Sequence, residues 1–170
     1  MNNKKYIITI DGPAASGKGS LSKVVANDLN LYYIETGIYY RVFAKNIKDQ
    51  GVTTEKNLKI EEFINKNHFD VNNKENIYND EISQLASILA KKEIVRSFIT
   101  KRQQYELANY SSEYRGILLE GRDCGTIIAP NANVKIFLTA DINVRASRRF
   151  KQSNNKKNDS NYERILMDLI

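Results

Sequence analysis

The chain has 170 residues, of which 41% are hydrophobic and 27% are charged, and its formal net charge at pH 7 is +6. This balance is typical of one globular domain and excludes a fibrous protein or a disordered tail. The apolar runs are only about as long as strands, so we expect no membrane span, and the N-terminus has no signal-peptide cleavage pattern. These features predict a cytoplasmic protein.

The single cysteine and the basic charge limit the chemistry. Cys124 alone can form neither an internal disulfide nor a multi-cysteine metal site, and we interpret it as a packing residue. The excess of 26 Lys and Arg over 20 Asp and Glu favours an anionic partner. The lysines are dispersed, and Lys156 and Lys157 lie in a polar stretch typical of a solvated loop, so we expect no nucleic-acid partner.

The first third of the chain alternates predicted strands and helices. Residues 6–10 (YIITI) and 31–34 (LYYI) are short apolar runs typical of strands. The helix predicted after the first strand has Ser22 on its polar face and a buried face formed by Leu21, Val24, Val25 and Leu29. The helix after the second strand ends at Gly51, and its inward face is formed by Tyr39, Val42, Phe43 and Ile47. This alternation predicts a parallel sheet.

The middle of the chain predicts a helical excursion outside the sheet. Residues 55–67 have helical spacing, residues 68–80 are polar, and residues 81–110 predict two helices. His68, in the polar stretch, is interpreted as solvated.

The sheet is predicted to resume after the excursion. Residues 117–120 (ILLE) and 134–138 (VKIFL) are short apolar runs that we expect to form buried parallel strands. Asp141 is expected to cap a helix, and residues 151–161 to form a mobile flap before a last helix.

A phosphate-binding motif joins the first strand to the first helix. Residues 11–20 read DGPAASGKGS and contain G-x-x-x-x-G-K, a loop whose backbone amides surround a phosphate while its lysine contacts the outer phosphates. The strand before it and the helix after it meet the structural condition of the motif. The predicted nucleotide-phosphate residues are Gly12, Pro13, Ala14, Ala15, Ser16, Gly17, Lys18, Gly19 and Ser20.

The lysine of this motif is followed by Gly19, where the strict pattern has Ser or Thr to hold magnesium. We therefore expect Mg²⁺ to be held mainly through the nucleotide and water, with Ser20 as a candidate direct ligand. The GKG arrangement resembles that of small nucleotide kinases of the adenylate kinase type.

Three arginines are candidates for binding a second, phosphate-bearing substrate. Arg41 and Arg122 follow the second and third predicted strands, and ligands of open parallel sheets gather beyond the carboxyl ends of the strands. Arg96 lies on a predicted helix, where an arginine by itself is more often solvated. Arginine suits this task because its planar guanidinium binds phosphate with two parallel hydrogen bonds.

Several stretches together resemble one known family. In order and spacing, DGPAASGKGSLSK, ETGIYYR, VRSFITKRQ, EGRDCGTIIAPNANVKIFLTA and RASRRF are similar to the bacterial cytidylate kinases, over residues 5–170. The resemblance implies transfer of the γ-phosphoryl group of ATP to CMP or dCMP, with Mg²⁺ accompanying ATP. It implies a three-layer α/β/α P-loop kinase fold with a small nucleoside-monophosphate-binding insert. The family has five parallel strands, and we expect four here.

The resemblance also implies roles for individual residues. The catalytic residues would be Lys18, Arg41 and Arg122, and the acceptor phosphate would contact Thr36, Arg41 and Arg122. The cytosine contacts would be Ser87, Arg96 and Asp123. A carboxylate can accept from the cytosine amino group while an arginine donates to O2 and N3, and uracil would disrupt this pattern. We therefore expect discrimination against UMP.

The expected organisation is one domain over residues 1–170. Its core comprises residues 1–51 and 111–170, the helical excursion residues 52–110, and the start of a lid residues 151–170. The chain departs from the family at Glu35, where aspartate is usual, in a shortened excursion, and in ending before the family's lid helix, fifth strand and last helix. The arginines of RASRRF either supply lid charge or form an exposed basic face; they are Arg145, Arg148 and Arg149.

Other functions stay open on the sequence alone. The chain could be a P-loop kinase for another small acceptor, such as AMP, UMP or shikimate, or a truncated ATP-binding module without turnover. A nucleic-acid binder would show steeply salt-dependent affinity, which the dispersed lysines do not favour. We expect a monomer.

Overall fold

The computed structural model describes residues 5–66, 70–152 and 159–169. The chain divides into two compact units, of which unit 1 comprises residues 1–34 and 111–170 and unit 2 comprises residues 35–110. The predicted single domain, with a core of residues 1–51 and 111–170, stays a prediction. His68, Lys156 and Lys157 lie outside the described residues, as does most of the predicted flap, so the interpretations of them also stay predictions.

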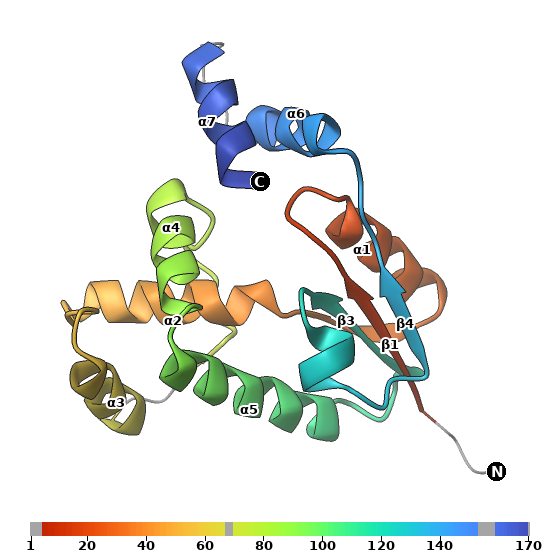
Figure 1. The fold of residues 1–170 in the computed structure, drawn as a ribbon. Coiled ribbons are helices and arrows are strands. Elements are labelled where there is room, and N and C mark those ends of the chain that lie inside the picture. Colours follow the sequence, from red (N-terminus) through yellow and green to blue (C-terminus); the bar gives the residue numbers. More distant parts are fainter. Residues whose placement is uncertain (1–4, 67–69, 153–158, 170) are drawn as a thin grey trace. The chain divides into compact units, whose positions relative to one another are not determined.

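Unit 1 contains a four-stranded sheet in the order β2-β3-β1-β4 (Figure 1). The strands are β1 (Tyr6–Asp11), β2 (Leu31–Glu35), β3 (Gly116–Gly121) and β4 (Val134–Phe137). β1 pairs in parallel with β3, from Tyr6 opposite Gly116 to Asp11 opposite Gly121, and in parallel with β4 on its other side. The predicted α/β class with four parallel strands is confirmed.

The core of unit 1 lies between the sheet and helix α1 (Lys18–Asp28). All six residues of β3 are buried, as expected for a central parallel strand flanked on both sides. Ile10, Leu31 and Leu118 from three strands pack with Ala26 of α1. The buried strands thus fix the position of the helix that follows the phosphate-binding motif.

The predicted buried face of α1 is wrong in part, because of its four residues only Val25 packs against the core, partly buried. Leu21, Val24 and Leu29 are 39%, 57% and 45% exposed, and the fully or nearly fully buried residues of the helix are Ser22 and Ala26. Small side chains allow the helix to lie close to the sheet, and α1 contacts β3. The helix must also present its first turn to the motif loop, so its rotation is not decided by hydrophobicity alone.

The prediction that residues 134–138 form a buried strand is also wrong in part. β4 forms and is parallel, but Val134, Ile136 and Phe137 are 44%, 40% and 70% exposed. The strand lies at the edge of the sheet, and within the described residues it pairs only with β1. An apolar run indicates a parallel strand but not whether both of its edges are covered.

The C-terminal part of unit 1 begins with the π-helical turn η1 (Cys124–Ile128), in which Cys124 is fully buried, so its predicted packing role is confirmed. α6 (Ile142–Gln152) follows, and the Asp141 carboxylate accepts from the Asn143 N–H at its start, which confirms the expected cap. α7 (Asp159–Leu169) packs against α6, with the rings of Phe150 and Tyr162 6.0 Å apart (Figure 1).

Unit 2 is helical. It contains α2 (Gly37–Asp49), α3 (Asn57–Lys66), α4 (Asp80–Leu89) and α5 (Glu93–Asn109). The two helices predicted within residues 81–110 are confirmed, as is the inward face of α2. Phe43 of α2 contacts the rings of Phe63 and Phe98 at 5.5 and 5.7 Å. Gly51 has φ +61°, the left-handed conformation that ends a helix, as predicted.

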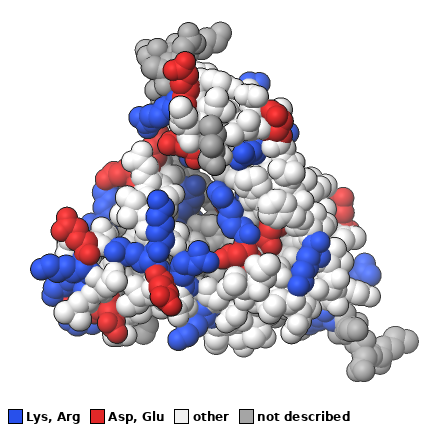
Figure 2. Space-filling model, in the orientation of Figure 1, with Lys and Arg blue, Asp and Glu red and all other residues white. Residues whose placement is uncertain are grey.

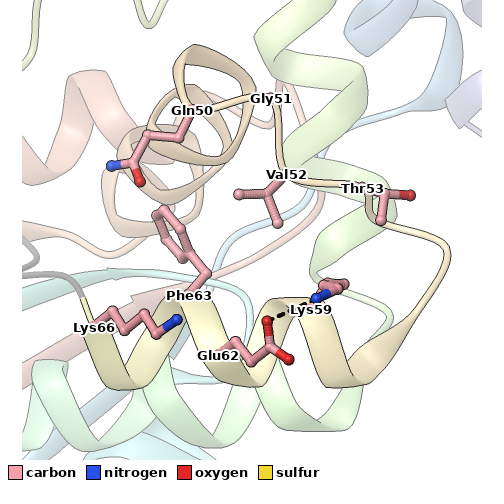
Figure 3. A pocket seen from close by; sticks show the side chains of 8 residues that line it. All are labelled: Gln50, Gly51, Val52, Thr53, Lys59, Glu62, Phe63 and Lys66. Atoms are coloured by element: carbon pink, nitrogen blue, oxygen red, sulfur yellow. Dashed lines mark hydrogen bonds and ion pairs between the residues drawn. The ribbon is translucent and has the colours of Figure 1, made fainter.

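A hollow in unit 2 is lined by none of the predicted site residues. Its volume is about 420 Å³, and Figure 3 shows Val52, on the loop that follows α2, and Phe63 of α3 projecting toward it. At its edge Lys59 donates to Glu62, and this hydrogen bond lowers the pKa of the Glu62 carboxyl. The hollow is therefore mainly apolar with a charged rim.

Two surface properties bear on partners. Over the described residues, no helix is both long and apolar enough to cross a bilayer. Figure 2 shows acidic side chains interspersed among the basic ones on the face drawn.

Candidate functional site

The motif loop of unit 1 is shaped for an anion. β1 ends at Asp11 and α1 begins at Lys18, so residues 12–17 form a tight turn between strand and helix. Gly17 precedes the helix with φ +97°, and its carbonyl accepts the first helical hydrogen bond, from Leu21 N at 3.1 Å. The amides of the first helical turn have no partner within a helix, and they attract an anion at this end.

Gly12 fixes where the loop leaves the sheet. Its N–H donates to Gly121 O of the neighbouring strand at 3.2 Å. A Cβ at position 12 would lie 2.1 Å from Leu138 O, closer than any side chain can approach. The first glycine of the motif is therefore required by the close approach of two backbones.

Ser16 supplies a polar group to the interior of the loop. Its side chain is buried, and within the described part of the chain Ser16 Oγ has no hydrogen-bond partner. A buried hydroxyl without a partner destabilises the fold by about 1–3 kcal/mol. An oxyanion bound in the loop would satisfy it, so this orphaned hydroxyl fits a phosphate group.

Lys18 lies over the loop and is held by a buried carboxylate. Lys18 Nζ donates to Pro13 O at 3.3 Å and lies 3.4 Å from Glu120 Oε1. Tyr33 OH donates to the other oxygen, Glu120 Oε2, at 3.1 Å. The sequence analysis missed Glu120 and Tyr33, although a carboxylate at the end of the apolar run ILLE was a usable signal.

Asp11 attaches the end of β1 to the loop that carries two predicted site residues. Its carboxylate accepts from Cys124 N and Gly125 N, both at 2.8 Å. These amides directly follow Arg122, which is exposed, and Asp123, which is partly exposed. Asp11 was also missed, and its signal was its place directly after a strand and before the motif. The motif loop and the EGRD segment are therefore joined at one end of the sheet.

The arginines of α6 divide between different contacts. Arg148 Nη1 donates to Ser16 O at 2.9 Å and to Ala15 O at 3.3 Å, so this guanidinium lies against the motif loop. Arg145 Nη2 donates to Leu169 O of α7 at 3.4 Å. Arg148 is exposed, whereas Arg145 and Arg149 are partly buried, so the expected exposed basic face describes Arg148 alone. Whether either acts in a lid stays a prediction.

Three of the predicted acceptor-site residues have hydrogen bonds to other residues of unit 2. Thr36 is buried at the start of α2, where its carbonyl accepts from the buried Gln103 Nε2 at 3.1 Å. Arg41 Nη1 donates to Ser83 Oγ at 2.6 Å and to Ile77 O at 3.3 Å. Ser87 Oγ donates to Ser83 O at 2.9 Å. The structure thus brings Arg41 and Ser87 to the same helix, α4.

The remaining acceptor-site residues are distributed over the two units. Arg96 is exposed on α5 of unit 2, whereas Arg122 and Asp123 follow β3 of unit 1. Gln103 and Ser83, which contact Thr36 and Arg41, were missed by the sequence analysis. Both lie far in sequence from the residues that they contact, so no local sequence pattern predicts these contacts.

The donor set around the motif loop suits a hard cation. Glu120 offers a carboxylate, and Ser16 and Ser20 offer hydroxyls, while over the described residues no group of three or more His, Cys, Asp or Glu is found. Mg²⁺ binds through one or two protein oxygens together with water and substrate phosphates. These residues therefore fit a magnesium ion that arrives with a nucleotide, and they do not fit a metal cage built by the protein.

A family model described as cytidylate kinase matches residues 8–170. A cytidylate kinase from Thermosipho africanus is 40% identical over 174 residues, covering 96% of this chain and 75% of that protein. One from Bacillus thuringiensis is 40% identical over 179 residues, covering 96% and 76%.

A solved structure supports the same fold. The crystal structure of TT1252 from Thermus thermophilus matches with a TM-score of 0.50 and 11% identity, covering 96% of this chain and 78% of that one. At that identity the match concerns the fold alone. Together with the motif geometry, the family match and the relatives lead to one conclusion: the chain belongs to the cytidylate kinase family.

Proposed function

We propose that this chain transfers the γ-phosphoryl group of ATP to CMP or dCMP, releasing ADP and forming CDP or dCDP. The observation that carries the proposal is the motif loop with Lys18 and the orphaned Ser16 hydroxyl, in a chain that matches the cytidylate kinase family over residues 8–170. An oxygen of the acceptor phosphate attacks the γ-phosphorus, and the bond between that phosphorus and its bridging oxygen breaks, with the electron pair leaving on ADP.

In this proposal the donor is held by the motif loop. Backbone amides of residues 14–20 surround the β-phosphate, and Lys18 moves from the Pro13 carbonyl toward the β and γ oxygens. Phosphoryl transfer passes through a loose transition state, so alignment and charge neutralisation supply most of the acceleration. Arg148, beside the loop carbonyls, is close enough to add positive charge at this end.

The acceptor in this proposal is held by arginines and a buried threonine. Arg41 and Arg122 bind the CMP phosphate, each with two parallel hydrogen bonds, and Thr36 contributes a further contact. No general base is needed because the attacking phosphate oxygen is already ionised. Ser87, Arg96 and Asp123 recognise the cytosine, with the Asp123 carboxylate accepting from its amino group.

Magnesium is the expected companion of ATP. It would be held by nucleotide oxygens and water, with Ser20 and Glu120 as candidate protein ligands, and when bound it would neutralise charge on the β and γ phosphates. The protein's own contribution remains the placement of Lys18 and the loop amides.

The proposal is tested by an ADP-release assay with ATP, Mg²⁺ and each of CMP, dCMP, UMP and AMP. We expect release to depend on CMP or dCMP and to be at least about tenfold slower with UMP, because an unpaired buried polar group costs about 1–3 kcal/mol. ATP binding without CMP-dependent ADP release would instead identify a binding module without turnover. A preference for AMP or UMP would identify a kinase for another acceptor.

A further inference from the structure

Arg41 is held by three different groups that lie close together in the chain. It starts from the second turn of α2, and its Nη1 donates to the Ile77 carbonyl and to Ser83 Oγ. Its guanidinium carbon lies 5.5 Å from the centre of the Tyr78 ring. A guanidinium has five donors in one plane, so it can hold two protein acceptors on one edge and a bidentate oxyanion on another.

The Ser83 hydroxyl is oriented by its own helix to accept from Arg41. Ser83 Oγ donates its single hydrogen to Asn79 O, one turn earlier, at 2.6 Å. With that hydrogen engaged, its lone pairs face the Arg41 Nη1, which can only donate. A charge-assisted hydrogen bond of this kind is about twice as strong as a neutral one.

The start of α4 is itself fixed, which makes Ser83 a defined anchor. Asn79 caps the helix by accepting from Ile82 N at 2.8 Å, and its side-chain amide donates to Asn76 O at 2.8 Å. Ile77 is fully buried, so its carbonyl cannot drift away from Arg41. The anchor is therefore built on a capped helix and a buried residue.

The same helix carries the predicted cytosine contact. Ser87 lies one turn beyond Ser83 and donates to Ser83 O. Residues four apart on a helix lie on one face, separated by about 6 Å along the axis. α4 thus carries both Ser83, which holds the arginine predicted to bind the phosphate, and Ser87, which is predicted to contact the base.

We propose that Ser83 is a positioning residue, which with the Ile77 carbonyl and the Tyr78 ring orients the Arg41 guanidinium toward the phosphate of the acceptor nucleotide. α4 thereby sets the spacing between the phosphate and base contacts. This inference rests on the proposed function, because it assigns Arg41 to the CMP phosphate. Displacement of a substrate-binding group by about 1 Å can cost about 10²-fold in rate, so the anchor matters beyond its own hydrogen bonds.

The test compares Ser83→Ala with two matched variants. Ser83→Thr keeps the hydroxyl, and Gln84→Ala changes an exposed neighbour on the same helix. We expect Ser83→Ala to raise KM for CMP about tenfold and to lower kcat, with KM for ATP unchanged. Ser83→Thr should restore most of the loss, and Gln84→Ala should behave like the original protein.

Calorimetric binding of CMP and cytidine separates positioning from a general structural role. Cytidine lacks the phosphate, so Ser83→Ala should weaken CMP binding about tenfold and leave cytidine binding unchanged. In an Arg41→Met background, Ser83→Ala should have no further effect on CMP binding. Equal weakening of both ligands, a persisting effect in the Arg41→Met background, or unchanged CMP binding by Ser83→Ala would each overturn the inference.

A second pair of variants covers the case in which Ser83→Ala does not fold. Tyr78 is 63% exposed, so Tyr78→Leu should fold while removing the ring from Arg41, and Tyr78→Phe keeps the ring. We expect weaker CMP binding for Tyr78→Leu only, and equal behaviour of the two variants would contradict the inference. If the unaltered protein turns over UMP or AMP and ignores CMP, the proposed function fails instead, whatever the variants do.

Discussion

The two units of the chain present their candidate binding groups in different ways. In unit 1 the anion cradle is made of backbone amides, and its shape depends on Gly12, Gly17 and the start of one helix. In unit 2 the candidate binding groups are side chains, and two of them are held by other parts of the unit, Arg41 by Ser83 and Thr36 by Gln103. The residues of a backbone site are consecutive and form a short motif, whereas the residues that form a side-chain site lie far apart in the sequence.

The largest effect is expected from removing the lysine of the backbone site. Lys18→Ala should lower kcat by on the order of 10³-fold, because it removes the charged donor that the proposed function assigns to the β and γ oxygens of ATP. The fold should persist, since Lys18 Nζ contacts only the loop carbonyl of Pro13 and Glu120 among its described partners.

An ADP-release assay and a thermal melt measure the two effects of Lys18→Ala separately. Lys23→Ala, an exposed lysine on the same helix, is the matched control and should retain activity. Normal turnover by Lys18→Ala would exclude the proposed donor site.

The backbone site should also be sensitive to a single methyl group. Gly12→Ala would place a Cβ 2.1 Å from Leu138 O, and relieving that clash should lower the free energy of unfolding by about 1–3 kcal/mol and weaken ATP binding. Gly37→Ala is the control, because nothing lies within 4 Å of its Cβ position. Denaturant unfolding and ATP titration of both variants measure the free energy of unfolding and the ATP affinity. Equal stability of the two variants would show that the loop accommodates the added methyl group and would contradict the prediction.

The base contact assigned to Asp123 should affect selectivity more than rate. Asp123→Ala should reduce the ratio of kcat/KM for CMP over UMP by about 10- to 100-fold, since the amino group of cytosine loses its acceptor. Asp123→Asn keeps the size of the side chain and tests whether charge is needed. An unchanged ratio in Asp123→Ala would contradict the assignment and leave base recognition to the side chains of unit 2.

The smallest expected effect is the contribution of Tyr110, the last residue of unit 2, to the pH dependence of stability. Burial raises the pKa of the Tyr110 phenol above its ordinary value of 10.0. The folded state therefore holds this proton more tightly than the unfolded state, so the contribution to stability is present below pH 10 and is lost as the pH rises beyond it. Denaturant unfolding between pH 8 and pH 11 should show a shallower decline for Tyr110→Phe, and identical slopes would refute it.

Much of the fold was predictable from local patterns. The strands, the order of helices and the stop at Gly51 follow from short apolar runs, helical spacing and one glycine. The exposure of β4 was not predictable, because an edge strand and a central strand share the same composition. The rotation of α1 was also missed, since Ser22 faces the sheet for reasons of size and not of polarity.

The candidate site divides in the same way. The motif loop could be proposed residue by residue because its chemistry lies in consecutive backbone groups, and its binding of a nucleotide stays a prediction. Glu120 and Asp11 were missed although both directly end strands, because their partners, Lys18 and the amides of Cys124 and Gly125, are distant in sequence. Ser83 could not have been found at all from its surroundings, since a helical serine is usually unremarkable.

The small side chains beneath α1 have a consequence for altering nucleotide affinity. Ser22 and Ala26 are the buried residues of α1, and the first turn of this helix follows the motif loop. A bulkier residue at either position would lift the helix from β3 and carry the loop amides with it. Substitutions at these two buried positions should therefore change the affinity for ATP without altering any residue predicted to contact its phosphates.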